Sequence, residues 1–194
     1  MGKVIAHMSM SLDGFVTGPD VRVEHPMGVG GERLHQWLFA NPGDPRDAQV
    51  AGEMFAPAHT GAVIMGRRTF DVGIGLWGDD GTFQLPCFVV THQPADRLIK
   101  GQTSFTFVTT GVRDALARAQ AVAGSRAVNV MGSAMIQQVL HAGLLDEVQI
   151  NLIPVLLGAG TRLFESFTTD KIELERTRIV ESPSATHLTY RIVK

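Results

Sequence analysis

The stretch VIMGRRTF, residues 63–70, decides the fold. An apolar run stops at Gly66 and polar residues follow at once, which predicts a buried strand that ends in a tight turn and opens a helix. The free N–H groups and the positive dipole end of a helix start favour an anion. The guanidinium groups of Arg67 and Arg68 suit bidentate phosphate contacts, and Thr69 adds a hydroxyl. The segment predicts a site for a phosphorylated cofactor, with an ordinary helix start and solvated arginines as the alternative.

A second segment, AVNVMGSAMIQQVL (residues 127–140), repeats this arrangement. We expect a buried strand to end at Gly132, a helix to begin within a residue or two, and Ser133 to serve as the N-cap. Such a turn brings backbone amides close to a pyrophosphate. Helix capping alone also explains a Gly-Ser pair before a helix. This segment therefore indicates a phosphate site only in combination with the first one.

Strands alternate with helices along three-quarters of the chain, and two strands close it. This order predicts an α/β fold with a mostly parallel central sheet, helices on both faces and an antiparallel C-terminal edge. In such sheets ligands bind at the carboxyl ends of the strands, so the loops there are expected to converge on one cleft. The expected strands are 4–10, 62–65, 86–90, 105–108, 127–131, 147–153, 172–180 and 186–193, and the expected helices are 32–40, 48–58, 67–72, 112–123 and 133–141.

The composition favours a single domain over residues 1–194, with no nucleic-acid or membrane partner. The net charge of −2 gives no excess of positive charge that would attract nucleic acid. No apolar run approaches the roughly 20 residues that span a bilayer. The N-terminal residues lack a signal-peptide pattern, and the single cysteine, Cys87, lies in an apolar run. We therefore expect a cytoplasmic protein with Cys87 in its core. The seven histidines follow no metal-ligand spacing, so no metal site is expected.

Four blocks of the chain carry a family resemblance. They are SMSLDGFV (9–16), MGRRTF (65–70), VVTHQP (89–94) and the long block 132–164, which contains HAGLLDEVQINLIPVLLGAGTRLF. With them the chain resembles the dihydrofolate-reductase-like superfamily, and within it the reductase domain of the riboflavin-biosynthesis deaminase–reductase and its stand-alone relatives. The resemblance implies a three-layer dihydrofolate-reductase-like fold and an NADPH-dependent reductase. The zinc deaminase signature is absent from the sequence, so the deaminase half is not expected.

The resemblance also implies the residues that bind NADPH. Arg67 matches the arginine that grips the 2′-phosphate, which fits the general rule that an arginine accommodates a 2′-phosphate whereas a carboxylate holds a free 2′-hydroxyl. At Ser133 this chain departs from the family, which usually has a second glycine there. The cofactor positions are Ser9 and Val16 beside the nicotinamide, Gly66, Arg67, Arg68 and Thr69 near the phosphates, Thr91 and His92 near the adenosine phosphate, Gly132, Ser133, Ala134, Met135 and Ile136 at the pyrophosphate, and Leu157 and Gly158 in a loop nearby.

The substrate side is less defined by the sequence. Asp13 either caps a turn or contacts substrate, and Glu32 or Arg33, depending on the alignment, occupies the position where folate reductases hold the pterin ring. Asp13 and Glu32 are therefore the catalytic candidates, and Asp13, Arg33 and Trp37 the substrate-binding candidates, although Trp37 also fits a core position. The glycine-rich segment 73–81 carries Trp77 and is expected to be a mobile or ligand-facing loop.

Three functions remain open from the sequence. The first is a stand-alone NADPH-dependent reductase of a small heterocyclic substrate, similar to the reductase of 5-amino-6-(5-phosphoribosylamino)uracil. The second is a dihydrofolate reductase, and the third is a non-catalytic protein that binds or senses NADPH. The resemblance also implies a homodimer.

Overall fold

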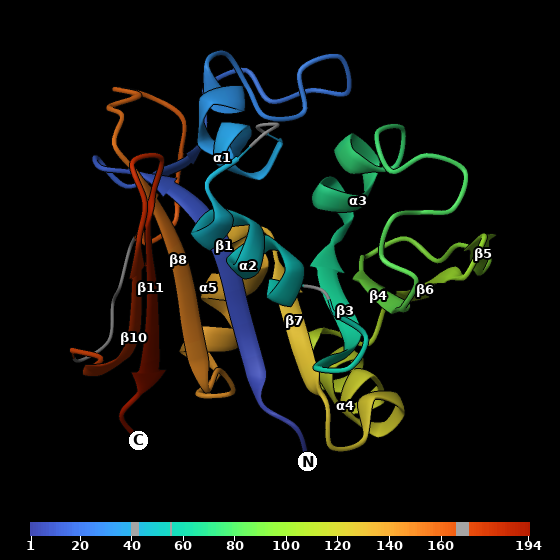
Figure 1. The fold of residues 1–194 in the computed structure, drawn as a ribbon. Helices are drawn as coiled ribbons and strands as arrows, with labels where there is room; N and C mark the ends of the chain where they lie inside the picture. The colour runs from blue at the N-terminus through green and yellow to red at the C-terminus, as the bar shows by residue number, and fades with distance from the viewer. Residues whose placement is uncertain (40–42, 55, 166–170) are drawn as a thin grey trace.

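The computed structural model describes residues 1–39, 43–54, 56–165 and 171–194. A nine-stranded sheet forms its centre, in the order β10-β11-β8-β1-β7-β3-β4-β6-β5 (Figure 1). The neighbours from β8 to β6 are parallel, whereas β10, β11 and β5 pair antiparallel. The strands are β1 (Val4–Ser11), β3 (Thr60–Gly66), β4 (Pro86–Val90), β5 (Leu98–Lys100), β6 (Thr103–Val108), β7 (Ala127–Met131), β8 (Glu147–Ile153), β10 (Leu174–Glu181) and β11 (Thr186–Ile192), with β2 (Phe15–Thr17) and β9 (Thr161–Arg162) in a separate pair.

Helices cover both faces of this sheet. Behind it in Figure 1 lie α4 (Val112–Ala123) and α5 (Ser133–His141), whose apolar residues pack on alternate residues of the central strands. The opposite face carries α1 (Gln36–Phe39), α2 (Pro45–Met54) and α3 (Arg67–Gly73). Because β3 is covered on both sides, its residues Thr60–Met65 are all buried. The expected fold class is confirmed, and no helix among the described residues is long and apolar enough to cross a membrane.

Several elements differ from the sequence prediction at their ends. The helix expected over 48–58 begins earlier, at Pro45, because Asp44 caps it by accepting a hydrogen bond from the Arg46 N–H at 2.9 Å. The helix expected over 32–40 begins instead as a 3₁₀ turn, η1 (Gly31–His35), before α1; residue 40 lies outside the described residues. The strands β2, β5 and β9 were not predicted, because two or three residues are too few to show a period.

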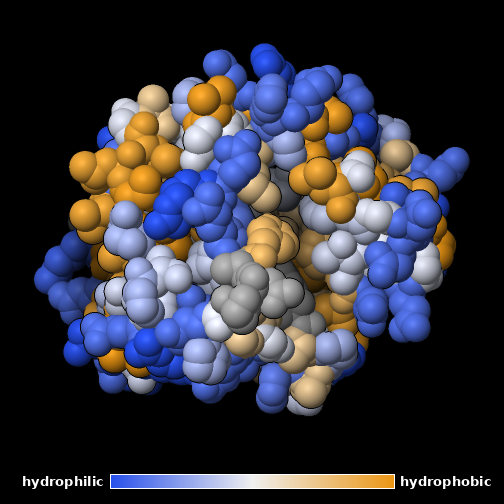
Figure 2. Space-filling view, turned by 45° about the horizontal axis from the view of Figure 1, so that its top comes forward, coloured by the Kyte–Doolittle hydropathy of each residue, from blue (hydrophilic) through white to orange (hydrophobic). Residues whose placement is uncertain are grey.

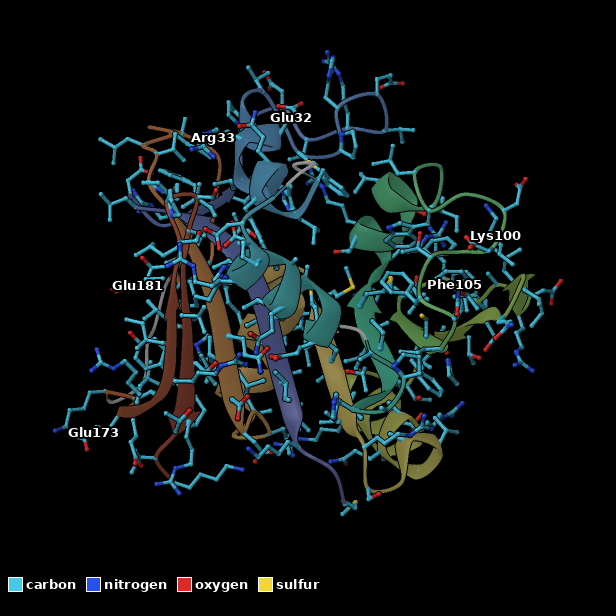
Figure 3. The ribbon with its side chains drawn as sticks, viewed as in Figure 1. Glu32, Arg33, Lys100, Phe105, Glu173 and Glu181 are labelled. Atoms are coloured by element: carbon cyan, nitrogen blue, oxygen red, sulfur yellow. The ribbon has the colours of Figure 1, made fainter. Side chains whose placement is uncertain are left out.

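The loop at 73–81 was expected to be mobile or to face a ligand, but its Trp77 packs against other aromatic residues. The Trp77 ring stacks on Phe105 at an interplanar angle of 7°, and its edge meets Phe83. A Cβ at Gly73 would lie 2.3 Å from the Trp77 ring, so the glycine makes room for the indole. This aromatic cluster, in which Figure 3 labels Phe105, also contains the buried Cys87, as expected. Burial raises the pKa of the Cys87 thiol, so Cys87 is an inert core residue.

A buried polar network lies between the sheet and the α1–α2 layer. The Asn151 amide donates to Nε2 of His7 at 2.9 Å, and its oxygen accepts from Nδ1 of His187 at 2.7 Å. Nε2 of His187 lies 2.9 Å from the buried Asp47 carboxylate. Burial lowers the pKa of His7 to about 4, so the ring is neutral near pH 7.

This lowered pKa predicts a pH dependence of stability. Because the unfolded chain binds a proton at His7 below its ordinary pKa of 6.5 and the folded chain only near 4, the free energy of unfolding should fall as the pH falls from 6.5 to 4. The lowering corresponds to an upper limit of about 3 kcal/mol at about 1.4 kcal/mol per unit. In urea unfolding of His7→Gln, the free energy of unfolding should fall less steeply between pH 6.5 and 4 than in the wild type. The control His25→Gln, which changes an exposed histidine, should keep the wild-type pH dependence. An unchanged slope in His7→Gln would contradict the assignment.

Candidate functional site

The two strand-to-helix corners lie side by side. The strands β3 and β7 are parallel neighbours with Met65 opposite Met131, so Gly66 and Gly132 leave the sheet at the same edge. The corners also touch, because a Cβ at Gly132 would lie 2.3 Å from Oγ1 of Thr69. Figure 2 brings this edge of the sheet forward and shows the surface hollowed near its centre. The convergence that the sequence predicts for these two corners is confirmed.

The second corner exposes backbone donors. Gly132 has φ +87°, a conformation that side chains disfavour, and it is the N-cap of α5. Its carbonyl accepts the N–H groups of Met135 and Ile136, while those of Ser133 and Ala134 find no acceptor among the described residues. The prediction that Ser133 is the N-cap is wrong by one residue, and its side chain makes no capping hydrogen bond. Two unpaired amides at the start of a nine-residue helix form an arrangement that suits a phosphate.

The first corner presents Arg67. Nε of its guanidinium donates to Asp71 at 2.7 Å, and the group lies over the ring of Phe107, 5.8 Å from its centre. The side chain remains 39% exposed, and no described residue accepts from its terminal nitrogens. Asp71 and Phe107 therefore hold a guanidinium that still offers its bidentate edge. Because α3 has only seven residues, the charge of Arg67 contributes more here than the helix dipole.

Thr91 and His92 lie at the end of the next strand. Gly66 is opposite Val90 in the register of β3 and β4, so Arg67 and Thr91 leave the sheet at the same level. The buried Thr91 hydroxyl accepts the Gln93 N–H at 3.1 Å and shapes the turn, whereas His92 is exposed. The three neighbouring strand ends thus bring Thr91, His92, Arg67 and the second corner to one edge.

Arg68 contacts the loop that follows β2. Its Nη2 donates to the Val21 carbonyl at 3.1 Å and so links α3 to the loop at 18–30. This hydrogen bond occupies one terminal nitrogen of the Arg68 guanidinium.

Asp13 fastens two loops together. Its carboxylate accepts from the Ser11 hydroxyl at 2.6 Å and from the backbone N–H groups of Leu157 and Gly158 at 3.1 and 2.7 Å. The Ser11 hydrogen bond, with help from these amides, lowers the pKa of Asp13 to about 2. The carboxylate is thus ionised near pH 7, and it holds the loop at Leu157 and Gly158 against the turn that follows β1. The same contacts occupy the amides of Leu157 and Gly158.

The remaining predicted residues lie around the start of the chain. Trp37 is only 3% exposed and donates its indole N–H to the Ser9 hydroxyl at 3.0 Å, so it occupies a core position. The Ser9 and Val16 side chains are buried as well. Figure 3 shows Glu32 at the top of η1 and Arg33 on its side nearer the chain after β8. Glu32 is exposed and Arg33 half-buried, so neither fills a buried acid position.

Sequence reasoning missed the two residues that position Arg67. Asp71 could have been found, since an acidic residue four positions after an arginine on a helix forms an ion pair. Phe107 could not have been found, because it lies on β6, two strands away from β3 in the sheet, and local sequence gives no sign of that contact. Among the described residues no group of three or more histidine, cysteine, aspartate or glutamate side chains could hold a metal ion.

Comparison with known proteins identifies the family. Residues 2–188 match the family model of the RibD C-terminal domain. The chain belongs to this family. Among curated proteins, this family member is 26% identical over 179 residues to the uncharacterized protein YwjB of Bacillus subtilis (strain 168), with 91% of each chain covered.

Solved structures share the fold. One is a putative riboflavin biosynthesis protein from Shewanella sp. PV-4, with a TM-score of 0.76, 22% identity and all of both chains covered. Another is dihydrofolate reductase from Enterococcus faecalis complexed with NADP(H), with a TM-score of 0.62, 17% identity, and 100% of this chain and 98% of that chain covered. These likenesses confirm the dihydrofolate-reductase-like fold that the sequence predicts.

The contact between the corners predicts the effect of a side chain at Gly132. Gly132→Ala should lower the free energy of unfolding by roughly 2 to 4 kcal/mol, because its methyl group adds a clash with Thr69 to the strain of a positive φ. The matched control is Gly111→Ala, which has φ +94° and nothing within 4 Å of its Cβ, so only the strain should appear.

Urea unfolding measures both effects. Adding Thr69→Ala to Gly132→Ala should restore part of the lost free energy of unfolding, because it removes the clashing hydroxyl. Adding it to Gly111→Ala should restore none. Equal losses in the two alanine variants, with no rescue in either, would contradict a contact between the corners.

Proposed function

We propose that this protein is an NADPH-dependent reductase of a small heterocyclic substrate. The observation that carries the proposal is the contact between the corners, which places two unpaired amides of α5 and the free edge of the Arg67 guanidinium along one edge of the sheet. A dinucleotide with a 2′-phosphate has two separate anionic groups, and this edge offers a separate site for each.

In the proposed complex, Ser133, Ala134 and the Thr69 hydroxyl bind the pyrophosphate, and the helix start that contains Met135 and Ile136 supports it. Arg67 binds the 2′-phosphate, with Thr91 and His92 beside it. NADPH supplies the hydride when bound, while the chain orients the ring and excludes water. The backbone around Ser9 and Val16 would line the nicotinamide end.

For the substrate we propose a pyrimidine–sugar compound related to 5-amino-6-(5-phosphoribosylamino)uracil. Family membership and the structural likeness to a putative riboflavin biosynthesis protein support this class. The half-buried Arg33 on η1 would favour an acidic or phosphorylated substrate over a cationic pterin. The exposed Glu32 weakens the case for dihydrofolate as substrate.

Turnover separates the alternatives. Steady oxidation of NADPH with the aminopyrimidine ribosylamine phosphate, and none with dihydrofolate, would support the proposed reductase. Binding of NADPH without turnover of either compound would favour a sensing protein.

Removing Arg67 should discriminate between cofactors. Arg67→Ala should weaken NADPH binding about 10- to 100-fold, because a charge-assisted contact to the 2′-phosphate is lost, and should change NADH affinity less than about threefold. Fluorescence titration of each cofactor measures both affinities. Arg118→Ala is the matched control, since it removes an arginine that also pairs with an aspartate four residues away but lies on α4. If the affinities for NADPH and NADH fell equally, Arg67 would not be the residue that binds the 2′-phosphate.

A further inference from the structure

A cavity lies under α2, away from the corners. Its volume is about 330 Å³, and α2, which passes in front of β1 in Figure 1, forms its outer wall. Lining residues Ile5, Thr60, Ala127 and Gln149 lie near the first residues of β1, β3, β7 and β8, whereas the corners lie at the strand ends. The cavity therefore belongs to the opposite end of the sheet from the proposed cofactor site.

Two buried polar side chains that line this cavity each have one atom without a protein partner. His7 and Asn129 are 7% and 3% exposed, and Nδ1 of His7 and Oδ1 of Asn129 find no hydrogen-bond partner among the described residues. Because the Asn151 amide donates to Nε2 of His7, the neutral ring carries its proton on Nδ1. The cavity thus holds one unused donor and one unused acceptor, and a native protein leaves few such groups unsatisfied.

The two groups are near each other. Ile5 lies opposite Asn129 in the register of β1 and β7, so His7, two residues further along β1, is the diagonal neighbour of Asn129 on the same face. A ligand that carries an acceptor beside a donor could satisfy both at once.

The charged groups around the cavity are paired. At its outer side, Arg178 forms an ion pair with Glu53, and both side chains are about 40% exposed. At its inner side, His187 is bonded to Asp47. No unpaired carboxylate or guanidinium remains among the described lining residues, which favours an uncharged ligand.

Apolar side chains form part of the remaining wall, and the cavity is larger than the site of a single water molecule. Val50 and Met54 from α2 lie on one side, and Val180 and Leu188 from the β10–β11 pair lie on another. The volume equals that of roughly ten water molecules, which is far more than one bridging water needs. A cavity of this size that combines apolar side chains with polar groups can hold a small molecule.

We propose that this cavity binds a neutral, planar cyclic amide, whose carbonyl accepts from Nδ1 of His7 and whose N–H donates to Oδ1 of Asn129. The proposal does not depend on the proposed reductase activity, because the two sites share no residue.

The probe is 2-pyridone, the simplest ring with an amide carbonyl beside an N–H, and its partner is 1-methyl-2-pyridone, which lacks the donor. In an NMR titration of the ¹⁵N-labelled full chain, 2-pyridone should produce saturable shifts at Ile5, Asn129 and Asn151 with Kd on the order of 1 mM. The methylated probe should bind at least about fivefold more weakly, because it leaves Asn129 unpaired.

Two variants and one competition complete the test. Ala127→Leu places a larger side chain in the cavity and should abolish the shifts, whereas Ala121→Leu on the exposed side of α4 should not. His7→Phe keeps a ring but removes the donor to the carbonyl that both probes share, so it should weaken the binding of both probes by similar factors and leave the preference for 2-pyridone in place. The absence of saturable shifts in the wild type, equal affinity for the two probes, persistence in Ala127→Leu or displacement by NADPH would each overturn the proposal.

Discussion

The close approach of Thr69 to Gly132 is the constraint on which the rest of the candidate site depends. Adjacent parallel strands bring their ends together in any doubly covered sheet, but a side chain at Gly132 would hold the two helices apart. With glycine there, α3 and α5 begin in contact, and the amides of Ser133 and Ala134 lie along the same edge as Arg67. The proposed dinucleotide site is thus a consequence of one missing Cβ and a strand register.

The sequence predicted the fold well where its signals were local. The bounds of β4, β7, α4, α5 and β8 match the expected ones, because a glycine or proline lies at or beside at least one end of each. Asp44 followed by Pro45 is a local start signal for α2, although the periodic pattern alone places the start at residue 48. Short strands such as β5 escaped, since they exist only through pairing with β6.

The candidate site was predictable in its positions but not in its contacts. The sequence placed Gly66 and Gly132 at strand ends correctly, yet it could not show that Val21 holds Arg68 or that Asp13 holds the loop at Leu157 and Gly158. These contacts join residues that are 47 to 145 positions apart, beyond the reach of any periodic pattern. The sequence also gives no sign of the cavity beside His7 and Asn129, because the cavity forms only when six strands and α2 meet.

Hydrogen–deuterium exchange with and without NADPH tests the central claim most directly. If one dinucleotide spans both corners, the amides of residues 66–70 and 132–136 should become protected together, while those of the β10–β11 pair should be unchanged. Protection at one corner alone, or at neither while NADPH is bound, would contradict the account.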